Sequence, residues 1–360
     1  MESVVGGSVA IVGGGVIGMA IALEVAPSVR DCILIDPSPG RGASWAAAGM
    51  LSAAAEIAPG EEGLLEDLKE AAAIWPAFAE RVTVVSDVDI GFARSSSVLA
   101  GATQSDVREV ERVAKVIRAA GARVEPLQAE ALTAIEPALG ARLHGGWLLP
   151  ADYRVDNRLF VEALLEAVKS VGVRIVEDRC EHLERTRTSI RLGLSHQGTL
   201  DVDRCVIATG AWAPFRGTEN LGLPTVRPVR GTTLRLGAAP GVEVPTRTVR
   251  AVVDSMHCYL VPRTDGSLVV GATSEEQGYD TVSPAGGVFR LLEGARAVFP
   301  GIDELIFGEA AVGLRPATPD HLPFVGAADD SRIIGAIGHY RNGLLLSPLA
   351  ARRAASLLLS

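Results

Sequence analysis

The sequence has few cysteines, no excess of basic residues and no uninterrupted apolar stretch long enough to cross a membrane. Its four cysteines, Cys32, Cys180, Cys205 and Cys258, lie far apart and form no CxxC pair. The spacing typical of metal and dithiol sites is therefore absent, and we expect free buried thiols and no metal. Acidic residues outnumber basic ones, 43 to 34. Nucleic-acid binding, which needs clustered Lys and Arg, is not expected.

The most apolar segment, residues 9–25, is interrupted by four glycines and by Glu24. It is typical of a strand, a turn and a helix rather than of a membrane span. The opening residues Met1, Glu2 and Ser3 lack the basic start of a secretory signal, so we expect a cytoplasmic protein without a membrane segment. A chain of 360 residues, 48% of them hydrophobic, can bury a large core and suggests two domains.

Glycine is abundant, and its first cluster carries a recognisable spacing. Gly13, Gly15 and Gly18 form a GxGxxG pattern between an apolar run and a helical pattern. Such glycines allow a tight turn, close approach of the backbone to a pyrophosphate, and helix–strand packing. Asp36 ends the next apolar run, where a carboxylate can accept both ribose hydroxyls. These features predict a dinucleotide-binding βαβ unit and leave NAD and FAD both open.

Two further segments favour FAD over NAD. Residues 42–51 are rich in small residues and contain Ser44; small residues let a chain pass close to a flat ring, although an ordinary Ala-rich helix would explain them as well. Residues 204–208 form an apolar run that ends in Thr209 and Gly210. A dinucleotide that contacts the protein at this second strand end as well is more typical of FAD than of NAD.

The order of patterns predicts an α/β fold with a Rossmann-like FAD-binding domain assembled from separated segments. Apolar runs at residues 9–12, 32–35 and 333–337 indicate parallel strands, and residues 63–140 have helical spacing. Residues 226–273 have the spacing of strands, including a hairpin turn at 263–266. We expect residues 1–80, 145–215 and 305–360 to form the FAD domain. Residues 81–144 and 216–304 should form an inserted substrate-binding domain with an antiparallel sheet.

Three more motifs make a family resemblance specific: HCYLVPR at 257–263, GLRP at 313–316 and GHYRNG at 338–343. With the motifs above, in this order, the sequence resembles the glycine oxidases of the D-amino acid oxidase group, including thiamine-pathway members. The resemblance covers residues 9–358. It implies FAD, oxidation of glycine, sarcosine and small D-amino acids by oxygen, and a homotetramer. It also implies that the imine is supplied to thiazole-synthesis proteins. No cysteine follows Cys258, so we expect the FAD to be bound non-covalently.

The family's cofactor contacts carry over, by position, to several segments of this chain. They fall on Val16, Ile17, Asp36, Ser44, Ala48, Gly49, Met50, Cys180, His339, Tyr340, Arg341, Asn342, Gly343, Leu344 and Leu345. Cys180 is expected to touch the adenine side through its backbone. Ala43 and Trp45 stand where relatives often carry Thr or Ser, so Ser44 should take more of the phosphate contact.

The family's substrate contacts carry over to Arg315 and Arg341 for the carboxylate and to Tyr259 for a hydroxyl. Guanidinium binds carboxylate bidentately and stays charged. His257, two residues from Tyr259 and so on the same strand face, is expected to line the pocket. Each residue also has a simpler interpretation. Arg315 could be a solvated charge, Arg341 could bind flavin or be structural, and Tyr259 could belong to the core.

We find no Ser/His/Asp order and no paired-carboxylate motif, so no residue is expected to act as a catalytic acid or base. Catalysis would rest on orientation and on electrostatic stabilisation of reduced flavin by the helix that starts near Asn342 and Gly343. Three alternatives remain open: a dehydrogenase with a non-oxygen acceptor, an oxidase of a larger amine, and a flavin-binding regulatory protein without turnover.

Overall fold

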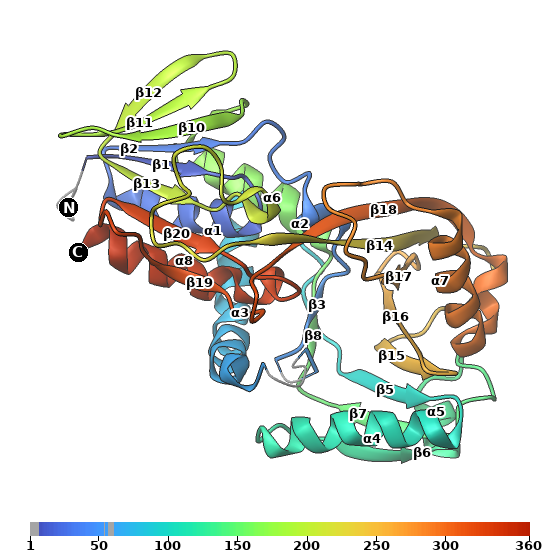
Figure 1. Ribbon diagram of the computed structural model, residues 1–360. Helices are drawn as coiled ribbons and strands as arrows, with labels where there is room; N and C mark the ends of the chain where they lie inside the picture. Colours follow the sequence, from blue (N-terminus) through green and yellow to red (C-terminus); the bar gives the residue numbers. More distant parts are fainter. Residues whose placement is uncertain (1–6, 54, 57–60) are drawn as a thin grey trace.

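The computed structural model describes residues 7–53, 55, 56 and 61–360 (Figure 1). Met1, Glu2 and Ser3, on which the expectation about a leader rested, lie outside this part. All four cysteines are free thiols; Cys32, Cys205 and Cys258 are buried, as expected, whereas Cys180 is only partly buried. Within the described residues, no helix has the length and apolarity needed to span a membrane. The helices are α1 (Val16–Val25), α2 (Ala43–Ala46), α3 (Leu65–Ser86), α4 (Gln104–Ala119), α5 (Ala129–Ile135), α6 (Asn157–Ser170), α7 (Ala285–Val298) and α8 (Gly343–Leu359).

The first sheet has the predicted parallel βαβ arrangement. Its strands, in spatial order, are β19 (Phe324–Ala327), β20 (Ile333–Ile337), β13 (Arg204–Ile207), β1 (Ser8–Val12), β2 (Asp31–Ile35) and β9 (Arg174–Val176). All neighbours are parallel except the β19–β20 pair. Helices α1, α3, α6 and α8 pack together on one face. The other face packs against the small antiparallel sheet β10 (Cys180–Arg185), β11 (Ile190–Leu194) and β12 (Gly198–Val202).

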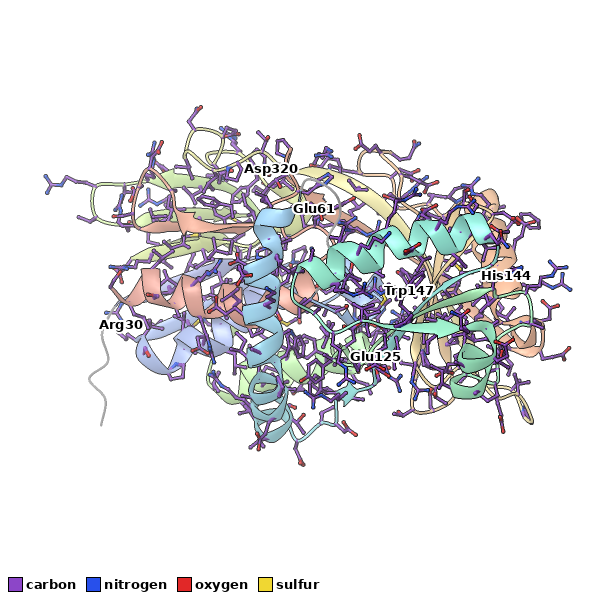
Figure 2. All side chains as sticks on the ribbon, turned by 90° about the horizontal axis from the view of Figure 1, so that it is seen from below. Arg30, Glu61, Glu125, His144, Trp147 and Asp320 are labelled. Carbon is purple, nitrogen blue, oxygen red and sulfur yellow. The ribbon has the colours of Figure 1, made fainter. Side chains whose placement is uncertain are left out.

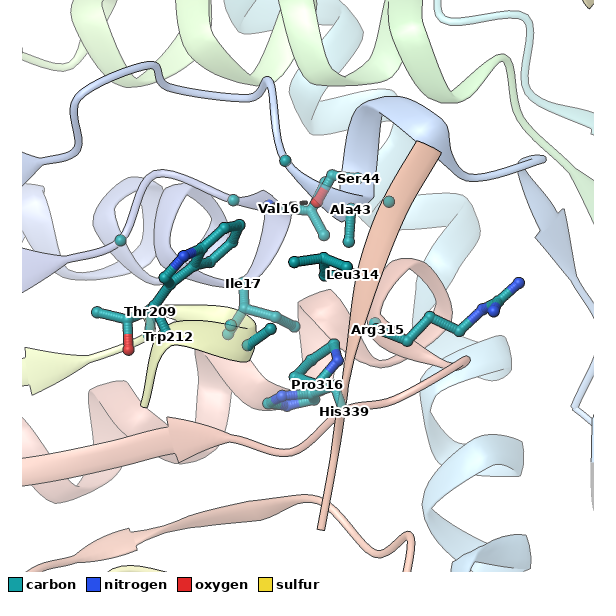
Figure 3. A pocket seen from close by; sticks show the side chains of 18 of the residues that line it. Val16, Ile17, Ala43, Ser44, Thr209, Trp212, Leu314, Arg315, Pro316 and His339 are labelled. Atoms are coloured by element: carbon teal, nitrogen blue, oxygen red, sulfur yellow. Dashed lines mark hydrogen bonds between the residues drawn. The ribbon is translucent and has the colours of Figure 1, made fainter. Parts of the chain in front are cut away.

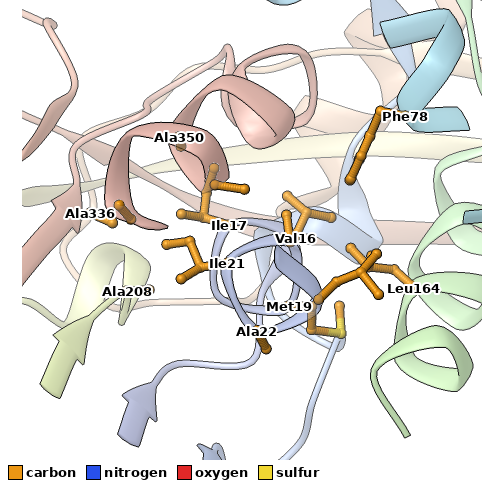
Figure 4. Packing of buried hydrophobic residues seen from close by; sticks show 14 of the residues in the cluster. Val16, Ile17, Met19, Ile21, Ala22, Phe78, Leu164, Ala208, Ala336 and Ala350 are labelled. Atoms are coloured by element: carbon orange, nitrogen blue, oxygen red, sulfur yellow. The ribbon is translucent and has the colours of Figure 1, made fainter. Parts of the chain in front are cut away.

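Helix α1 is the centre of this half of the molecule, because nine of its ten residues are buried. Figure 4 shows Ile17, Met19 and Ile21 radiating from it towards the neighbouring helices. Gly18 lets the helix approach the preceding turn, since a Cβ there would overlap the carbonyl oxygen of Gly13. The third glycine of the motif therefore has a packing role.

The second sheet is mostly antiparallel and lies at the other end of the molecule (Figure 1). In order, its strands are β18 (Ile306–Ala317), β14 (Arg227–Gly237), β17 (Leu268–Gly271), β16 (Met256–Pro262), β15 (Thr248–Val253), β5 (Ser97–Gly101), β7 (Gly145–Leu149) and β6 (Glu125–Gln128). The predicted turn at 263–266 joins β16 to β17. Helices α5 and α7 pack on one face. On the other, α4 covers only the β15–β5–β7 end, where Trp147 lies beside it (Figure 2).

Sheet membership corrects the predicted segments in two places. β7 and β18 were expected in the FAD domain, yet both belong to the second sheet. β18 pairs with β14 from Arg227↔Ala317 to Gly237↔Ile306. The backbone groups of β18 form their hydrogen bonds with β14 along this whole length. The apolar pattern of one strand does not show which distant strand will pair with it. The expected helical stretch 63–140 also contains β5, β6 and β4 (Ala93–Arg94), which joins β3 (Met50–Leu51) and β8 (Tyr153–Arg154) in a small sheet.

Candidate active site

A cavity of about 820 Å³ lies between the carboxyl ends of the parallel strands and the uncovered face of the second sheet. Most of the predicted site residues line it: Gly13, Gly15, Val16, Ile17, Asp36, Ser44, Ala48, Gly49, Met50, Cys180, Thr209, Gly210, His339, Tyr340, Arg341, Gly343, Leu344, Tyr259 and Arg315. In Figure 3, Thr209 and Trp212 lie at one end and the Arg315 side chain extends towards the other. Ligands of open α/β sheets commonly bind at such carboxyl ends.

The glycine turn and the start of α1 have the features of an anion site. Gly13 has φ +111°, a conformation that favours glycine, and a Cβ there would overlap the carbonyl oxygen of Ala208. The N-cap residue of α1 is Gly15, which has no side chain to cap the helix. The first turn of α1 contains no acidic residue. Ser44 Oγ, which accepts the Val16 N–H (3.2 Å), lies at this helix start. Free N–H groups and the helix dipole favour a pyrophosphate here.

Asp36 fixes the rim of the turn. Its two carboxylate oxygens accept the N–H groups of Gly14 and Ser38, both at 2.7 Å. The carboxylate thus lies at the end of β2, next to the anion site, where the ribose of a dinucleotide would reach it. Trp45, the departure from the family pattern, does not line the cavity; its ring lies under the guanidinium groups of Arg41 (3.7 Å) and Arg158 (4.5 Å).

Several polar groups on the cavity wall have no partner within the described part of the chain. Thr209 Oγ1 is buried and forms no hydrogen bond. The backbone N–H groups of Ala48 and Gly49 likewise donate to no acceptor among the described residues. Buried unpaired groups are rare in folded proteins unless a ligand or water satisfies them. Together with the glycine turn and Asp36, they fit a long dinucleotide such as FAD.

Arg315 occupies the far end of the cavity. Its guanidinium lies over Gly231 of β14, in the space that a Cβ at Gly231 would occupy. It donates to the carbonyl oxygens of Thr273 (3.1 Å) and Arg230 (3.5 Å). Within the described residues it forms no ion pair with a carboxylate. A cation held only by carbonyl oxygens at a cavity wall is a ready site for a substrate carboxylate.

Tyr259 shares this end of the cavity. Its ring lies across Gly271 of the neighbouring strand β17, where a Cβ would overlap it. Burial raises the pKa of Tyr259, although the nearby Arg315 opposes the shift. The hydroxyl is therefore neutral at physiological pH and can donate a hydrogen bond.

Arg341 also lines the cavity, but its charge is already paired. Its Nη2 donates to Glu61 Oε2 (2.5 Å) and to the carbonyl oxygen of Glu56 (3.2 Å). The Glu61 side chain is only 4% exposed and also contacts His321 Nδ1 (3.1 Å). Glu61 precedes α3, near the helix end that Figure 2 shows beside its label. Glu56, in turn, forms an ion pair with Arg250 at 2.5 Å. Sequence reasoning missed Glu56, Glu61 and Arg250, because no motif marks a counterion that comes from a distant segment.

Four predicted residues lie outside the cavity lining. His257 is 69% exposed and pairs with Glu109 of α4 (2.8 Å). It is on the same face of β16 as Tyr259. Because it lies two residues further along the strand, it is outside the cavity and beside α4. Gly18 lies inside α1, and the Leu345 side chain is in the helical core. Asn342 is the N-cap position of α8.

His339 is buried where β18 approaches the start of α8, below Pro316 in Figure 3. Burial lowers its pKa to about 4, so the imidazole is neutral at pH 7. No cluster of His, Cys, Asp and Glu suited to a metal occurs among the described residues.

Comparison with known proteins places this site in a family. The model of the DAO family, described as FAD dependent oxidoreductase, matches residues 8–357. A glycine oxidase of Geobacillus kaustophilus is 34% identical over 97% of this chain and 92% of its own length. The crystal structure of glycine oxidase from Geobacillus kaustophilus aligns with a TM-score of 0.90 at 33% identity, covering 98% of this chain and 94% of that one. The bifunctional protein ThiO/ThiG of Synechocystis sp. is 34% identical over 98% of this chain; this chain spans about half (51%) of that relative.

Proposed function

Because the chain belongs to the DAO family of FAD-dependent oxidoreductases, we propose that it catalyses the oxidative deamination of glycine, sarcosine and small D-amino acids. The amino acid, oxygen and water would give a 2-oxo acid, ammonia (methylamine from sarcosine) and hydrogen peroxide through an imine. Bound FAD would supply the chemistry of accepting a hydride from the substrate Cα and passing two electrons to oxygen. The Geobacillus glycine oxidase, similar over nearly the whole chain, supports this substrate class.

The single observation that carries the proposal is the Arg315 guanidinium, which has carbonyl partners but no carboxylate among the described residues. Arg315 belongs to β18, and its guanidinium occupies the space above Gly231 of β14. A small amino acid brings one carboxylate, and a guanidinium can bind it bidentately. The neutral Tyr259 hydroxyl at the same end can donate to it as well. Arg341 also lines the cavity, but because it is paired with Glu61 it would contribute less to binding of the carboxylate.

The remaining residues would act by position and charge, without a dedicated acid or base. The carboxylate of Glu56, which also lines the cavity, is paired with Arg250. An amine that arrives neutral needs no base, and holding it in place lowers the entropic part of the barrier. The start of α8 at Gly343 would direct its positive dipole end at the flavin edge on which charge develops.

We further propose that the imine serves thiazole formation for thiamine, which the similarity to bifunctional ThiO/ThiG proteins supports. A homo-oligomer, which rests on the family resemblance, belongs to the same proposal, as do non-covalent FAD and a cytoplasmic location.

An anaerobic screen of flavin reduction tests the proposal. Glycine, sarcosine, both alanine enantiomers and D-proline are mixed with the holoenzyme, and bleaching of the flavin is followed. Reduction by glycine or sarcosine, followed by peroxide formation when air is admitted without another acceptor, is expected. Reduction without peroxide would indicate a dehydrogenase, and no reduction by any of these amines would exclude the proposed substrate class.

A further inference from the structure

The backbone of residues 44–49, which forms one wall of the cavity, is held from behind by side chains of the second sheet and of α6. Every carbonyl oxygen of this segment accepts a hydrogen bond. The partners are Asn157 Nδ2 for Ser44 and Trp45 (2.8 and 3.1 Å), Thr233 Oγ1 for Ala46 (2.8 Å), Arg235 Nη2 for Ala47 (2.6 Å), Arg263 Nη2 for Ala48 (2.9 Å) and the Val155 N–H for Gly49 (2.9 Å).

These contacts have a local cause. Helix α2 is four residues long, so its last carbonyl groups have no partner within the helix. Ala46, Ala48 and Gly49 are buried, and buried carbonyl groups require donors. Arginine side chains commonly supply them at helix C-termini.

Two of the six bonds have a consequence for the cavity. The carbonyl of Ala47 and the N–H of Ala48 belong to one peptide group, and so do the carbonyl of Ala48 and the N–H of Gly49. Both peptide bonds are trans, so each N–H points away from the guanidinium that binds its carbonyl. These are the two N–H groups that lack an acceptor among the described residues and whose residues line the cavity. A cation on the carbonyl side polarises the peptide and strengthens its N–H as a donor.

The charge behind this wall is not fully compensated. Arg235 and Arg263 lie side by side and share Asn157 Oδ1 (3.1 and 3.0 Å). Arg263 forms an ion pair with Asp156 (3.1 Å), whereas Arg235 forms none with any described carboxylate. Burial and the neighbouring Arg263 lower the pKa of Arg235 to about 10, so it stays charged at neutral pH. Arg263 is buried and Arg235 is half-buried, and two adjacent guanidinium groups in such an environment are costly to keep charged.

We propose that Arg235 and Arg263 are positioning residues for the cofactor: through the peptide groups 47–48 and 48–49 they present two polarised N–H donors to the flavin ring. Their excess positive charge stabilises the negative charge that reduction places on the ring, and so raises its reduction potential. The inference rests on FAD binding by the family and not on the proposed substrate.

The test measures the two-electron reduction potential of the bound flavin by dye-coupled titration without any amine. Arg235→Gln keeps a hydrogen-bond donor and removes the charge; Arg235→Lys keeps the charge. We expect Arg235→Gln to shift the reduction equilibrium at least tenfold towards oxidised flavin, about 30 mV, and Arg235→Lys to restore most of it. Arg204→Gln is the matched control, because Arg204 also donates to backbone carbonyls (Leu357 and Leu358) but at the far end of α8.

A second variant keeps the test decisive if Arg235→Gln does not retain FAD. Asp156→Asn removes the carboxylate paired with Arg263, while its Oδ1 can still cap α6 through the N–H groups of Arg158 and Leu159. The potential should then rise. A loaded Arg235→Gln protein with the parental potential, or an Asp156→Asn protein whose potential is unchanged or lower, would overturn the proposal. Neither result depends on whether glycine is the substrate.

Discussion

At the residue scale, the arginines in and around the site differ in whether a carboxylate is paired with them. Arg341 pairs with Glu61, Arg250 with Glu56, and Arg263 with Asp156. Arg315 has carbonyl partners alone among the described residues. A paired guanidinium binds a new carboxylate weakly, because its field is already compensated. The absence of a carboxylate partner among the described residues is why we propose Arg315 as the partner of the substrate carboxylate.

Replacing Arg315 should therefore damage catalysis and spare cofactor binding. For Arg315→Ala we expect kcat/KM for glycine to fall by about 3 kcal/mol of transition-state stabilisation, or more than 100-fold, mainly through KM. Peroxide-coupled kinetics and the flavin-to-protein absorbance ratio measure the two effects. Arg341→Ala is the matched comparison and should lose less. Unchanged kinetics in Arg315→Ala would refute the assignment.

His339 should make folding stability sensitive to acid. Its pKa is about 4 in the folded protein and about 6.5 when unfolded, so the unfolded chain binds more protons between these values. Stability is then complete above pH 6.5 and falls as the pH drops towards 4. Between pH 7.5 and 5.0 we expect this residue to cost about 2 kcal/mol. Denaturant titration of the holoenzyme and of His339→Gln at both pH values checks this: the variant should lose about that much less, and equal losses would contradict it.

At the scale of elements, the site depends on strand and helix ends brought together from distant segments. The sequence was sufficient to predict the βαβ unit and the hairpin at 263–266, because each has a local pattern. It did not reveal that β18 joins the second sheet or that His257 extends beyond the cavity. Those depend on strand pairing and on what covers each part of a sheet face. The Arg235 and Glu61 contacts are likewise tertiary and leave no periodic signal.

The glycine turn before α1 depends on Asp36, which ties Gly14 and Ser38 together. Asp36→Ala should loosen that turn and remove an acceptor for the ribose hydroxyls. We expect FAD affinity to weaken at least tenfold, the effect of one or two charged hydrogen bonds. Flavin occupancy after gel filtration reports it, with Asp31→Ala, an exposed residue at the other end of β2, as the control. Full occupancy in Asp36→Ala would count against this role.

Strand β14 leaves room for the Arg315 guanidinium at Gly231. A Cβ at this position overlaps only the end of that flexible side chain, and the backbone there does not require glycine. Gly231→Ala should therefore fold and bind FAD normally, while kcat/KM for glycine drops roughly tenfold or more as the guanidinium is displaced. Steady-state kinetics with glycine decide it. Parental kinetics in the variant would mean that the Arg315 position is not critical.

At the scale of the whole molecule, the cavity exists because two sheets of different construction face each other. The parallel sheet supplies the glycine turn, Asp36 and the start of α8, and the antiparallel sheet supplies Arg315 and Tyr259. The α/β fold and the dinucleotide site could be predicted, because they depend on local motifs in a fixed order. The division of β7 and β18 between the sheets could not, because hydrogen-bond partners far apart in the chain decide it.

The most direct test of the account is anaerobic reduction of the bound flavin by glycine, measured by stopped-flow absorbance for the parent protein and for Arg315→Ala. The account predicts that glycine bleaches the parental flavin, and that the variant, loaded with FAD to the same extent, needs far higher glycine concentrations. A parental flavin that stays oxidised with glycine, sarcosine and small D-amino acids, or a variant that is reduced as readily as the parent, would contradict it.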